Sequence, residues 1–308
     1  MKLYIADAFT DHLFGGNPAG VVILDDGGDF PDDQICVQTA AELRYSETVF
    51  IKKNPLREGS QERFHLRYFT PEKEVELCGH ATIAAFSVMS RFGIIENEGD
   101  FTIMTLAGDL TVNVKNGFVM MEMGAPEYLG TLTEAPEIAE LYRTMGLSFE
   151  DVIPAVDCCQ YARLLPSIVS TGLPDIIMPV ASLAELDSIA PDFSALAELS
   201  KRYGVIGVHA FTLQNSVNEE GVRAHTRNFA PLVGINEEAA TGTSNGALTY
   251  YLHINGLIDD NSESLFVQGE AMGRPSKVYS HIRKSEDGKL SIRIGGTGVT
   301  LAAGEIYI

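Results

Sequence analysis

The stretch VELCGHATIAAF, residues 75–86, sets a cysteine, a glycine and a histidine directly before an apolar run. The segment ATIAAFSVMSRF that begins at Ala81 is apolar on nearly every helical face. Such a helix is buried all round, so a sheet must curl about it. Its free N–H groups and positive dipole end would point out of the core, where they could hold an anion. The stretch therefore predicts a core helix whose exposed N-terminus is a site.

The second half of the chain repeats this arrangement. Matching segments occur in the same order: RYFTP (67–71) with RNFAP (227–231), Cys78-Gly79 with Thr241-Gly242, and SETVFI (46–51) with GVHAFT (207–212). Fourteen residues after Gly79 and Gly242 stand Gly93 and Gly256, each followed by an apolar pair, as where a left-handed glycine ends a helix. We interpret the pattern as a duplicated β-rich unit with one core helix in each copy.

Alternating apolar and polar residues predict strands at residues 3–9, 46–51, 64–69 and 110–114. The segment PDDQICVQTAAELRY, residues 31–45, is typical of a helix with Pro31 in its first turn. A Gly- and Pro-rich stretch, Gly124 to Glu137, reads as a linker. The sequence thus predicts an α+β fold of two pseudo-symmetric domains, residues 1–123 and 124–299, each a barrel-like sheet around a central helix.

Composition excludes several classes of protein. The 308 residues carry a net charge of −20, whereas nucleic-acid binding needs a basic surface. The four cysteines, two of them adjacent at 158–159, form neither a disulfide framework nor a zinc motif, which favours the cytoplasm. Asp7 and Asp11 interrupt the N-terminus, so no signal peptide is expected, and no apolar run is long enough to span a membrane.

The candidate residues at the first helix start each allow a structural interpretation. Gly79 and Gly242 could be anion-binding helix starts or packing glycines. His80 could carry a proton, donate a hydrogen bond or cap the helix, and the dipole end would lower its pKa. Cys78 could be a thiolate activated by the same helix end, or a small buried apolar residue.

Two acidic positions lie near these helix starts in the sequence. Glu47, in SETVFI, could act in the site or face water. Glu237-Glu238, just before Thr241, could belong to the site or form a solvated loop pair.

Four segments together resemble the PhzF family of phenazine-biosynthesis isomerase-like proteins. They are FGGNPAGVV (14–22), SETVF (46–50), YFTPEKEVELCGHAT (68–82) and EEAATGTSNGAL (237–248). The resemblance implies the diaminopimelate epimerase-like fold, in which two barrel-like domains each wrap a central helix. It also implies that a last strand, about residues 300–308 with EIYI at its end, returns to the first domain. A cofactor-free isomerase, usually a homodimer, is expected.

The resemblance also assigns roles to residues. It implies that Glu47 is the acid and base, supported by His80 and Glu238. It implies that a small carboxylic-acid substrate is held by Asn17, Ser46, Gly79, Gly242 and Thr243, with no metal. The family usually has Asp-Pro where this chain has Glu238-Ala239, and Ser at Thr243. One extra methylene moves the carboxylate by about 1 Å, enough to change the substrate or the rate, so the phenazine intermediate itself is not the expected substrate.

The sequence thus predicts a cofactor-independent, cytoplasmic isomerase that moves a proton on a small carboxylic acid in a cleft between the two domains, with no nucleic-acid or membrane partner. One alternative is a racemase, epimerase or dehydratase that uses Cys78. The partner position of Cys78 in the repeat is Thr241, which argues against a two-thiol racemase. A second alternative is a non-catalytic relative that binds small carboxylates.

Overall fold

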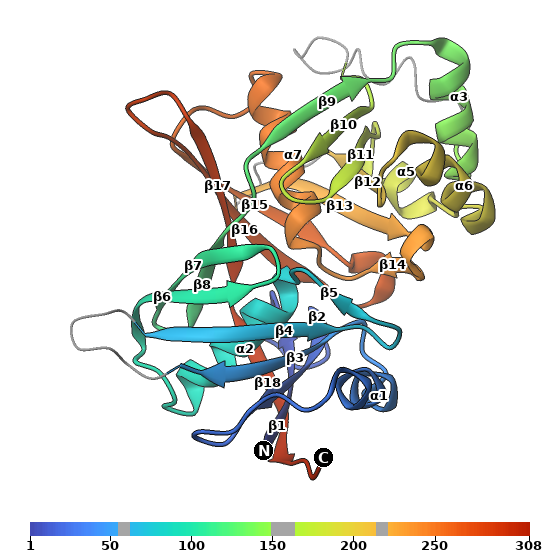
Figure 1. Ribbon diagram of the computed structural model, residues 1–308. Coiled ribbons are helices and arrows are strands. Elements are labelled where there is room, and N and C mark those ends of the chain that lie inside the picture. Colours follow the sequence, from blue (N-terminus) through green and yellow to red (C-terminus); the bar gives the residue numbers. More distant parts are fainter. Residues whose placement is uncertain (55–61, 149–163, 214–220) are drawn as a thin grey trace. The chain divides into compact units, whose positions relative to one another are not determined.

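The computed structural model of the protein describes residues 1–54, 62–148, 164–213 and 221–308. These residues form two compact units (Figure 1): unit 1 is Met1–Glu122 with Gly295–Ile308, and unit 2 is Met123–Ile294. Both units combine many strands with few helices, which confirms the expected α+β class. The adjacent cysteines at 158–159 lie outside the described residues.

Unit 1 holds one fully buried helix among strands. Its elements are β1 (Lys2–Ala8), β2 (Asn17–Ile23), α1 (Asp33–Leu43), β3 (Thr48–Lys53), β4 (Arg63–Phe69), β5 (Glu74–Val75), α2 (Gly79–Arg91), β6 (Glu98–Thr105), β7 (Gly108–Lys115), β8 (Phe118–Glu122) and β18 (Gly298–Glu305). The first strand, β1, pairs antiparallel with both β2 and β18, so the end of the chain returns to its beginning.

Unit 2 has the same kind of architecture with more helices outside the sheet. Its elements are β9 (Glu127–Thr131), α3 (Ala135–Thr144), β10 (Ser167–Ser170), β11 (Pro174–Pro179), α5 (Leu183–Ser188), α6 (Phe193–Tyr203), β12 (Gly207–Thr212), β13 (Val222–Ala230), η2 (Pro231–Val233), β14 (Ile235–Glu238), α7 (Gly242–Ile254), β15 (Ser262–Gln268), η3 (Glu270–Met272), β16 (Ser276–Lys284) and most of β17 (Leu290–Gly296). Helices α3, α5 and α6 pack on a cluster that includes Leu141, Leu186 and Leu196.

The duplication predicted from the sequence is visible in the strand order of each unit. In unit 1, β2 pairs parallel with β3, β3 antiparallel with β4, β4 parallel with β6, and β6 antiparallel with β7. In unit 2, β11, β12, β13, β15 and β16 repeat this series of pairings in the same order. The central helix follows a short strand in both copies, β5 before α2 and β14 before α7.

One arginine–glutamate fork recurs at the same place in both units. On β4, the guanidinium of Arg67 donates from Nε and Nη2 to the two carboxylate oxygens of Glu74, at 2.8 and 2.6 Å. On β13, Arg227 makes the same two bonds to Glu237, both at 2.8 Å. Each guanidinium also lies over the phenylalanine two residues later, with centroid distances of 5.0 and 4.9 Å. A bidentate fork fixes geometry better than a single bond, so it ties each short strand to its long neighbour.

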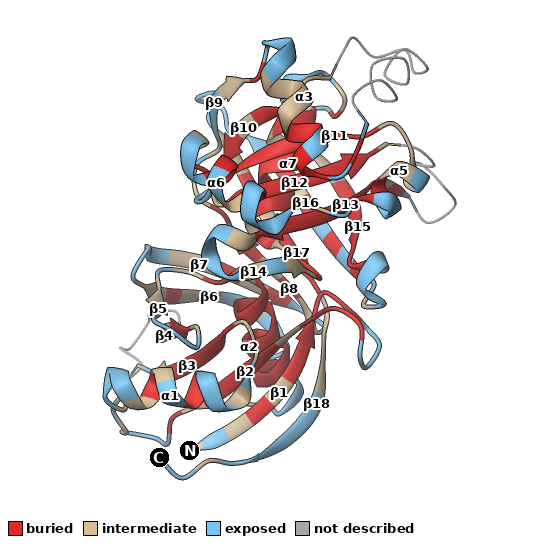
Figure 2. Cartoon of the chain, turned by 90° about the vertical axis from the view of Figure 1, so that its right-hand side faces the viewer, coloured by how far each residue is buried: buried red, intermediate tan, exposed pale blue. Residues whose placement is uncertain are grey.

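The two central helices are buried as expected, and Figure 2 colours most of their length as buried. Helix α2 contacts β1, β2, β3, β8 and β18, and every residue from His80 to Ser90 is buried. Helix α7 contacts β10, β11 and β16. Both helices run into the predicted left-handed glycines, Gly93 at φ 68° and Gly256 at φ 70°. A side chain at such a φ is strained, which explains why both copies use glycine there.

Three local predictions differ from the structure. Helix α1 begins at Asp33, so Pro31 lies before the helix and not in its first turn. The expected linker at 124–137 contains β9 and the start of α3. Strand β9 forms there because it pairs with β10, with a register shift between Ile168 and Val169. The last strand is β18, which ends at Glu305, so most of the EIYI segment lies beyond it.

Candidate active site

The turn between α1 and β3 places Ser46 and Glu47. Helix α1 ends at Leu43 and is capped by Arg44, which has a left-handed backbone (φ 60°) and whose N–H donates to the carbonyl of Ala40. Strand β3 begins only at Thr48, so Glu47 precedes the strand in which the sequence placed it. The carbonyl of Glu47 accepts a bond from the N–H of Gly20 on β2, at 3.3 Å. This bond fixes the backbone from which the carboxylate projects.

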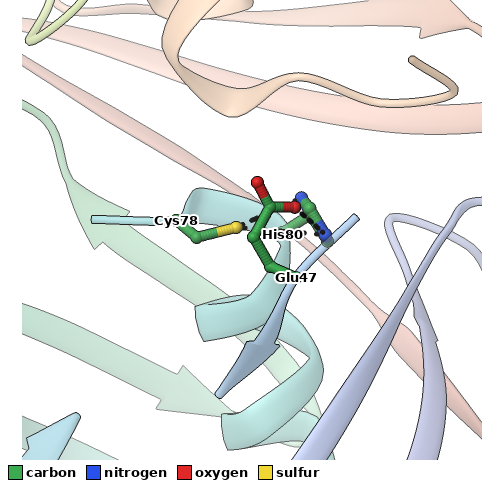
Figure 3. Close-up of side chains that lie close together, drawn as sticks. All are labelled: Glu47, Cys78 and His80. Atoms are coloured by element: carbon green, nitrogen blue, oxygen red, sulfur yellow. Dashed lines mark hydrogen bonds and ion pairs between the residues drawn. The ribbon is translucent and has the colours of Figure 1, made fainter. Parts of the chain in front are cut away.

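Three reactive side chains converge at the start of α2 (Figure 3). The Oε2 atom of Glu47 lies 3.4 Å from Nε2 of His80. The Sγ atom of Cys78 lies 3.3 Å from Nδ1 of the same ring and 3.9 Å from its Nε2. The Ser46 hydroxyl is 3.4 Å from Nε2. The imidazole of His80 is therefore the centre of the group, between a thiol on one side and a carboxylate and a hydroxyl on the other.

The environment keeps the His80 ring neutral. Burial lowers the pKa of His80 below its usual value, and the nearby Glu47 carboxylate opposes that shift only in part. A neutral imidazole has one donor and one acceptor nitrogen. His80 can therefore exchange hydrogen bonds with Cys78 at Nδ1 and with Ser46 at Nε2 at the same time.

One carboxylate oxygen of Glu47 is buried without a hydrogen-bond partner, as is Oδ1 of Asp175 in unit 2. Glu47 is only 9% exposed, and its Oε2 accepts no bond although it lies near the His80 ring. Burying a carboxylate oxygen without a donor costs several kcal/mol, so such groups are uncommon in native proteins. An oxygen kept free in this way is available to bind a proton or a ligand.

The backbone at the start of α2 is held from inside unit 1. The Thr82 hydroxyl donates to the carbonyl of Cys78 at 2.8 Å, so the Tyr68 hydroxyl must be the donor in its 2.7 Å bond to Thr82. Burial raises the pKa of Tyr68, which keeps its proton in place. The helix start receives no side-chain capping bond from Cys78. The positive dipole end of α2 lies at the His80 cluster.

The start of α7 in unit 2 has a different character. The Thr241 hydroxyl donates to Oε2 of Glu238 at 2.7 Å. The Gln268 side chain accepts from the N–H of Thr241 at 3.1 Å and from Asn245 at 2.7 Å, and donates to the carbonyl of Glu238 at 2.8 Å. The carbonyl of Thr243 accepts from the Thr171 hydroxyl at 2.9 Å. Hydrogen bonds within unit 2 therefore engage much of this helix start.

Sequence reasoning missed a buried polar network beneath the first turn of α7. The Ser244 hydroxyl donates to Asp175 at 2.5 Å and accepts from Asn228 at 3.0 Å, and Asn228 lies 3.4 Å from His209. Burial raises the pKa of Asp175 to about 6, against the opposing bonds from Ser244 and Gly207. Burial lowers the pKa of His209 to about 3. Two sequence features could have predicted this network: an aspartate inside the apolar segment LPDIIMPV and a histidine inside GVHAFT.

The predicted site residues fall into two groups. Unit 1 contains Ser46, Glu47, Gly79 and His80, with Cys78 beside them, and Asn17, which is buried at the start of β2. Unit 2 contains Glu238, Gly242 and Thr243 around the start of α7. The cleft expected to join the two groups stays a prediction of the sequence.

The cluster in unit 1 also has the composition of a metal site. One ligand atom each from Glu47, Cys78 and His80 lies within 4.8 Å of the others, and this is the one such group among the described residues. The set combines a carboxylate, a thiol and an imidazole, the three ligand types that zinc takes in proteins.

The chain is similar to known proteins over its whole length. The family model described as phenazine biosynthesis-like protein matches residues 6–304. An uncharacterized isomerase of Clostridium acetobutylicum is 32% identical over 100% of this chain and 98% of its own length. A PhzF-family phenazine biosynthesis protein of Bacillus anthracis has a TM-score of 0.84 and 27% identity, covering 100% of this chain and 99% of its own.

A more distant solved structure, a probable proline racemase of Agrobacterium radiobacter, has a TM-score of 0.64 at 14% identity. It covers 100% of this chain and 93% of its own, and its likeness shows the fold alone. These neighbours identify the fold as diaminopimelate epimerase-like. Among the described residues, none of the helices combines the length and apolar character needed to cross a membrane.

Proposed function

The chain belongs to the phenazine biosynthesis-like family and is an isomerase, and we propose that Glu47 moves a proton between two carbon atoms of a small carboxylic acid. The observation that carries this proposal is the buried Oε2 atom of Glu47. It has no hydrogen-bond partner and lies 3.4 Å from a histidine held neutral by burial. A carboxylate oxygen without a donor is free to accept a proton from a bound substrate.

The proposed reaction needs one acid and base group. Glu47 takes a proton from a carbon next to an electron-withdrawing group, and the electron pair shifts into the adjacent π system. The protonated carboxyl then returns the proton to another carbon on the same face. The group must be shielded from water, because a proton exchanged with solvent is lost from the transfer. The 9% exposure of Glu47 supports such shielding.

The negative charge that develops on the substrate needs a counterpart. The N-terminus of α2, whose first turn contains His80 beside Glu47, would supply N–H groups and the positive end of the helix dipole. His80, as a neutral imidazole, can donate a hydrogen bond to the substrate without itself adding a positive charge. Both would bind the developing anion of the transition state more tightly than they bind the ground-state substrate. This difference in binding is what lowers the barrier.

The remaining predicted residues keep their expected roles within this proposal. Ser46, Gly79 and Asn17 would hold the substrate from unit 1, and Gly242 and Thr243 from unit 2. Glu238 would support the site from the start of α7, where its carboxylate accepts the Thr241 hydroxyl. The homodimer and the cytoplasmic location expected from the resemblance belong to the same proposal.

A proton-exchange screen tests the proposal. The protein is incubated in D₂O with small cyclic, unsaturated and amino carboxylic acids, and deuterium at carbon is read by mass spectrometry and NMR. We expect one class of acid to change the position of a double bond or substituent, with little deuterium uptake while the proton stays on Glu47. An acid that binds but undergoes neither isomerisation nor exchange would instead support the small-carboxylate-binding alternative.

The contact between Cys78 and His80 favours a second candidate. Their 3.3 Å separation is that of a thiol and a base, as needed for a thiol-based racemase, epimerase or dehydratase. Racemisation through a thiol would place solvent deuterium at the α-carbon of the product. The same screen therefore separates the two reactions, since a Glu47 transfer keeps the substrate's own proton.

A further inference from the structure

We propose that Glu47, Cys78 and His80 form a binding site for Zn²⁺, with one coordination position open to water or to a ligand. Zinc binding does not depend on the proposed isomerase reaction. The sequence contains no zinc motif that would predict this site. The three residues come from the turn before β3 and from the start of α2, so only the folded unit 1 brings them together.

The distances between the ligand atoms fit a tetrahedral ion. Typical zinc bond lengths place a nitrogen and an oxygen ligand about 3.4 Å apart, and a sulfur and a nitrogen about 3.6 Å apart. In this protein, Nε2 of His80 is 3.4 Å from Oε2 of Glu47 and 3.9 Å from Sγ of Cys78. The sulfur lies 3.3 Å from Nδ1 and within 4.8 Å of the Glu47 ligand atom, so the cysteine side chain has to rotate toward the ion to bind it together with Nε2.

The electrostatic state of the ligands also suits a cation. The buried Oε2 atom of Glu47 has no hydrogen-bond donor, and a cation would satisfy it. The Cys78 thiol gives up its proton when sulfur binds the ion, and that proton passes to solvent.

Groups around the three ligands support the site as an outer shell. The Thr82 hydroxyl holds the carbonyl of Cys78, and Tyr68 holds Thr82. The Ser46 hydroxyl lies 3.4 Å from Nε2 of His80 and could turn toward a water on the fourth position. Three protein ligands with one open position are the arrangement of zinc sites that exchange ligands, whereas structural zinc sites are closed by four.

Occupation of this site has a consequence for activity. An ion on Oε2 of Glu47 and Nε2 of His80 would occupy the groups proposed to move the proton, so it would inhibit the isomerase. This consequence rests on the proposed function. The open coordination position of the bound ion would also accept a small carboxylate as the fourth ligand.

The test measures metal binding without any substrate. Cys158 and Cys159 are first replaced by serine, so that Cys36 and Cys78 are the remaining cysteines. The chelator-treated protein is titrated with Zn²⁺ against a coloured chelator, and separately with Co²⁺, whose bond to a thiolate adds a charge-transfer absorption. We expect one ion to bind per chain, thiolate absorption to appear with Co²⁺, and one proton to be released on binding. Variants that lose binding should also lose this proton release.

Substitutions identify the ligands. Cys78→Ser should lower the zinc affinity by at least about 100-fold, the upper end of what loss of an outer-shell partner costs a metal site, and should abolish the thiolate absorption. Glu47→Gln should weaken binding while leaving that absorption. Cys36→Ser is the matched control, because this thiol is buried away from the cluster and burial raises its pKa to about 11.

Two results would overturn the site: a parent protein that fails to compete with the chelator, or a Cys78→Ser variant that binds zinc and shows thiolate absorption like the parent. Circular dichroism of each variant establishes that the fold is retained. Failure of the proposed isomerase would be seen separately, as absence of isomerisation in zinc-free protein, and would leave the binding result unaffected.

Discussion

The starts of the two central helices are alike in backbone and opposite in chemistry. Both helices have thirteen residues and follow a residue in extended conformation, Cys78 at φ −138° or Thr241 at φ −125°. In both, a single C-cap residue separates the end of the helix from a left-handed glycine. At α2, however, the first turn lies beside a thiol, an imidazole and a carboxylate oxygen without a donor. At α7, Gln268 and Thr171 bind the backbone of the corresponding turn.

The difference shows which features of a duplicated unit are shared by both copies and which are specific to one copy. The backbone needs of a buried helix are the same in both copies, so the glycines and the Arg–Glu forks are the same. Reactive groups need poorly satisfied polar atoms, and these lower stability. In unit 1 such an atom is Oε2 of Glu47, and in unit 2 it is Oδ1 of Asp175, whose carboxylate accepts one bond from the Ser244 hydroxyl at its other oxygen. We expect the two helix starts to respond differently to substitution.

Replacing the free carboxylate should have the largest effect. Glu47→Gln keeps the shape of the side chain but removes the proton acceptor, so activity should fall by about three orders of magnitude or more while the fold survives. Loss of a general base usually costs 10²–10⁴-fold, and this group must also return the proton. The measurement is turnover of the acid found in the exchange screen, with the exposed Glu96→Gln as the control. A Glu47→Gln enzyme within tenfold of the parent would move the base elsewhere, to His80 or Glu238.

Neutralising the enclosed carboxylate should change stability with pH. The pKa of Asp175 is raised from 3.8 in the unfolded chain to about 6 in the fold. Stability from this group is therefore full below pH 4 and is lost as pH rises through 6, a difference of roughly 3 kcal/mol. Asp175→Asn should remove this loss, so the variant should gain on the parent between pH 4 and pH 7.

Urea unfolding at several pH values measures the gain of Asp175→Asn. The readout is the difference between variant and parent, because His209, with its pKa lowered to about 3, contributes the opposite slope to both below pH 6.5. Asp259→Asn, at an exposed aspartate of unit 2, serves as the matched control. A difference that stays flat with pH would show that Asp175 does not titrate in this range.

A small residue within α7, Gly246, should be needed for packing. A methyl group on Gly246 would lie 2.7 Å from Oγ1 of Thr171, which is held by its bond to the carbonyl of Thr243. Gly246→Ala should therefore destabilise by about 1–2 kcal/mol, although alanine favours a helix by up to about 1 kcal/mol. Thermal unfolding measures the loss. Adding Thr171→Ala should recover part of it, and a double variant no more stable than Gly246→Ala would argue against this contact as the cause.

The thiol at the reactive helix start should matter least to turnover. Cys78→Ala should keep activity within about tenfold in zinc-free buffer, because Glu47 is the proposed base and the loss of one buried sulfur is mainly a packing defect. Kinetics of Cys78→Ala and Cys78→Ser, with circular dichroism for folding, measure this. Losses of about 10³-fold in both variants would reject the Glu47 mechanism and favour the thiol-based racemase or dehydratase.

The sequence by itself determined the repeat, the fold class and the two buried helices. Helix bounds followed from local physics, since an apolar run needs burial and a glycine at positive φ ends it, as at Gly93 and Gly256. Local sequence patterns gave a wrong prediction where hydrogen bonding between strands outweighed the preference of the composition for a loop. Strand β9 forms in a Gly- and Pro-rich stretch because β10 lies beside it and supplies its hydrogen bonds.

Only the tertiary structure decided the environment of the reactive groups. The sequence motifs indicated Glu47 and His80 as candidates. The 3.4 Å distance between Oε2 of Glu47 and Nε2 of His80, however, depends on where the turn before β3 lies relative to α2. The network of Asp175, His209, Asn228 and Ser244 joins three strands and a helix. Residues so distant along the chain carry no local signal of each other, because hydrogen bonding and desolvation depend on neighbours in space and not in sequence.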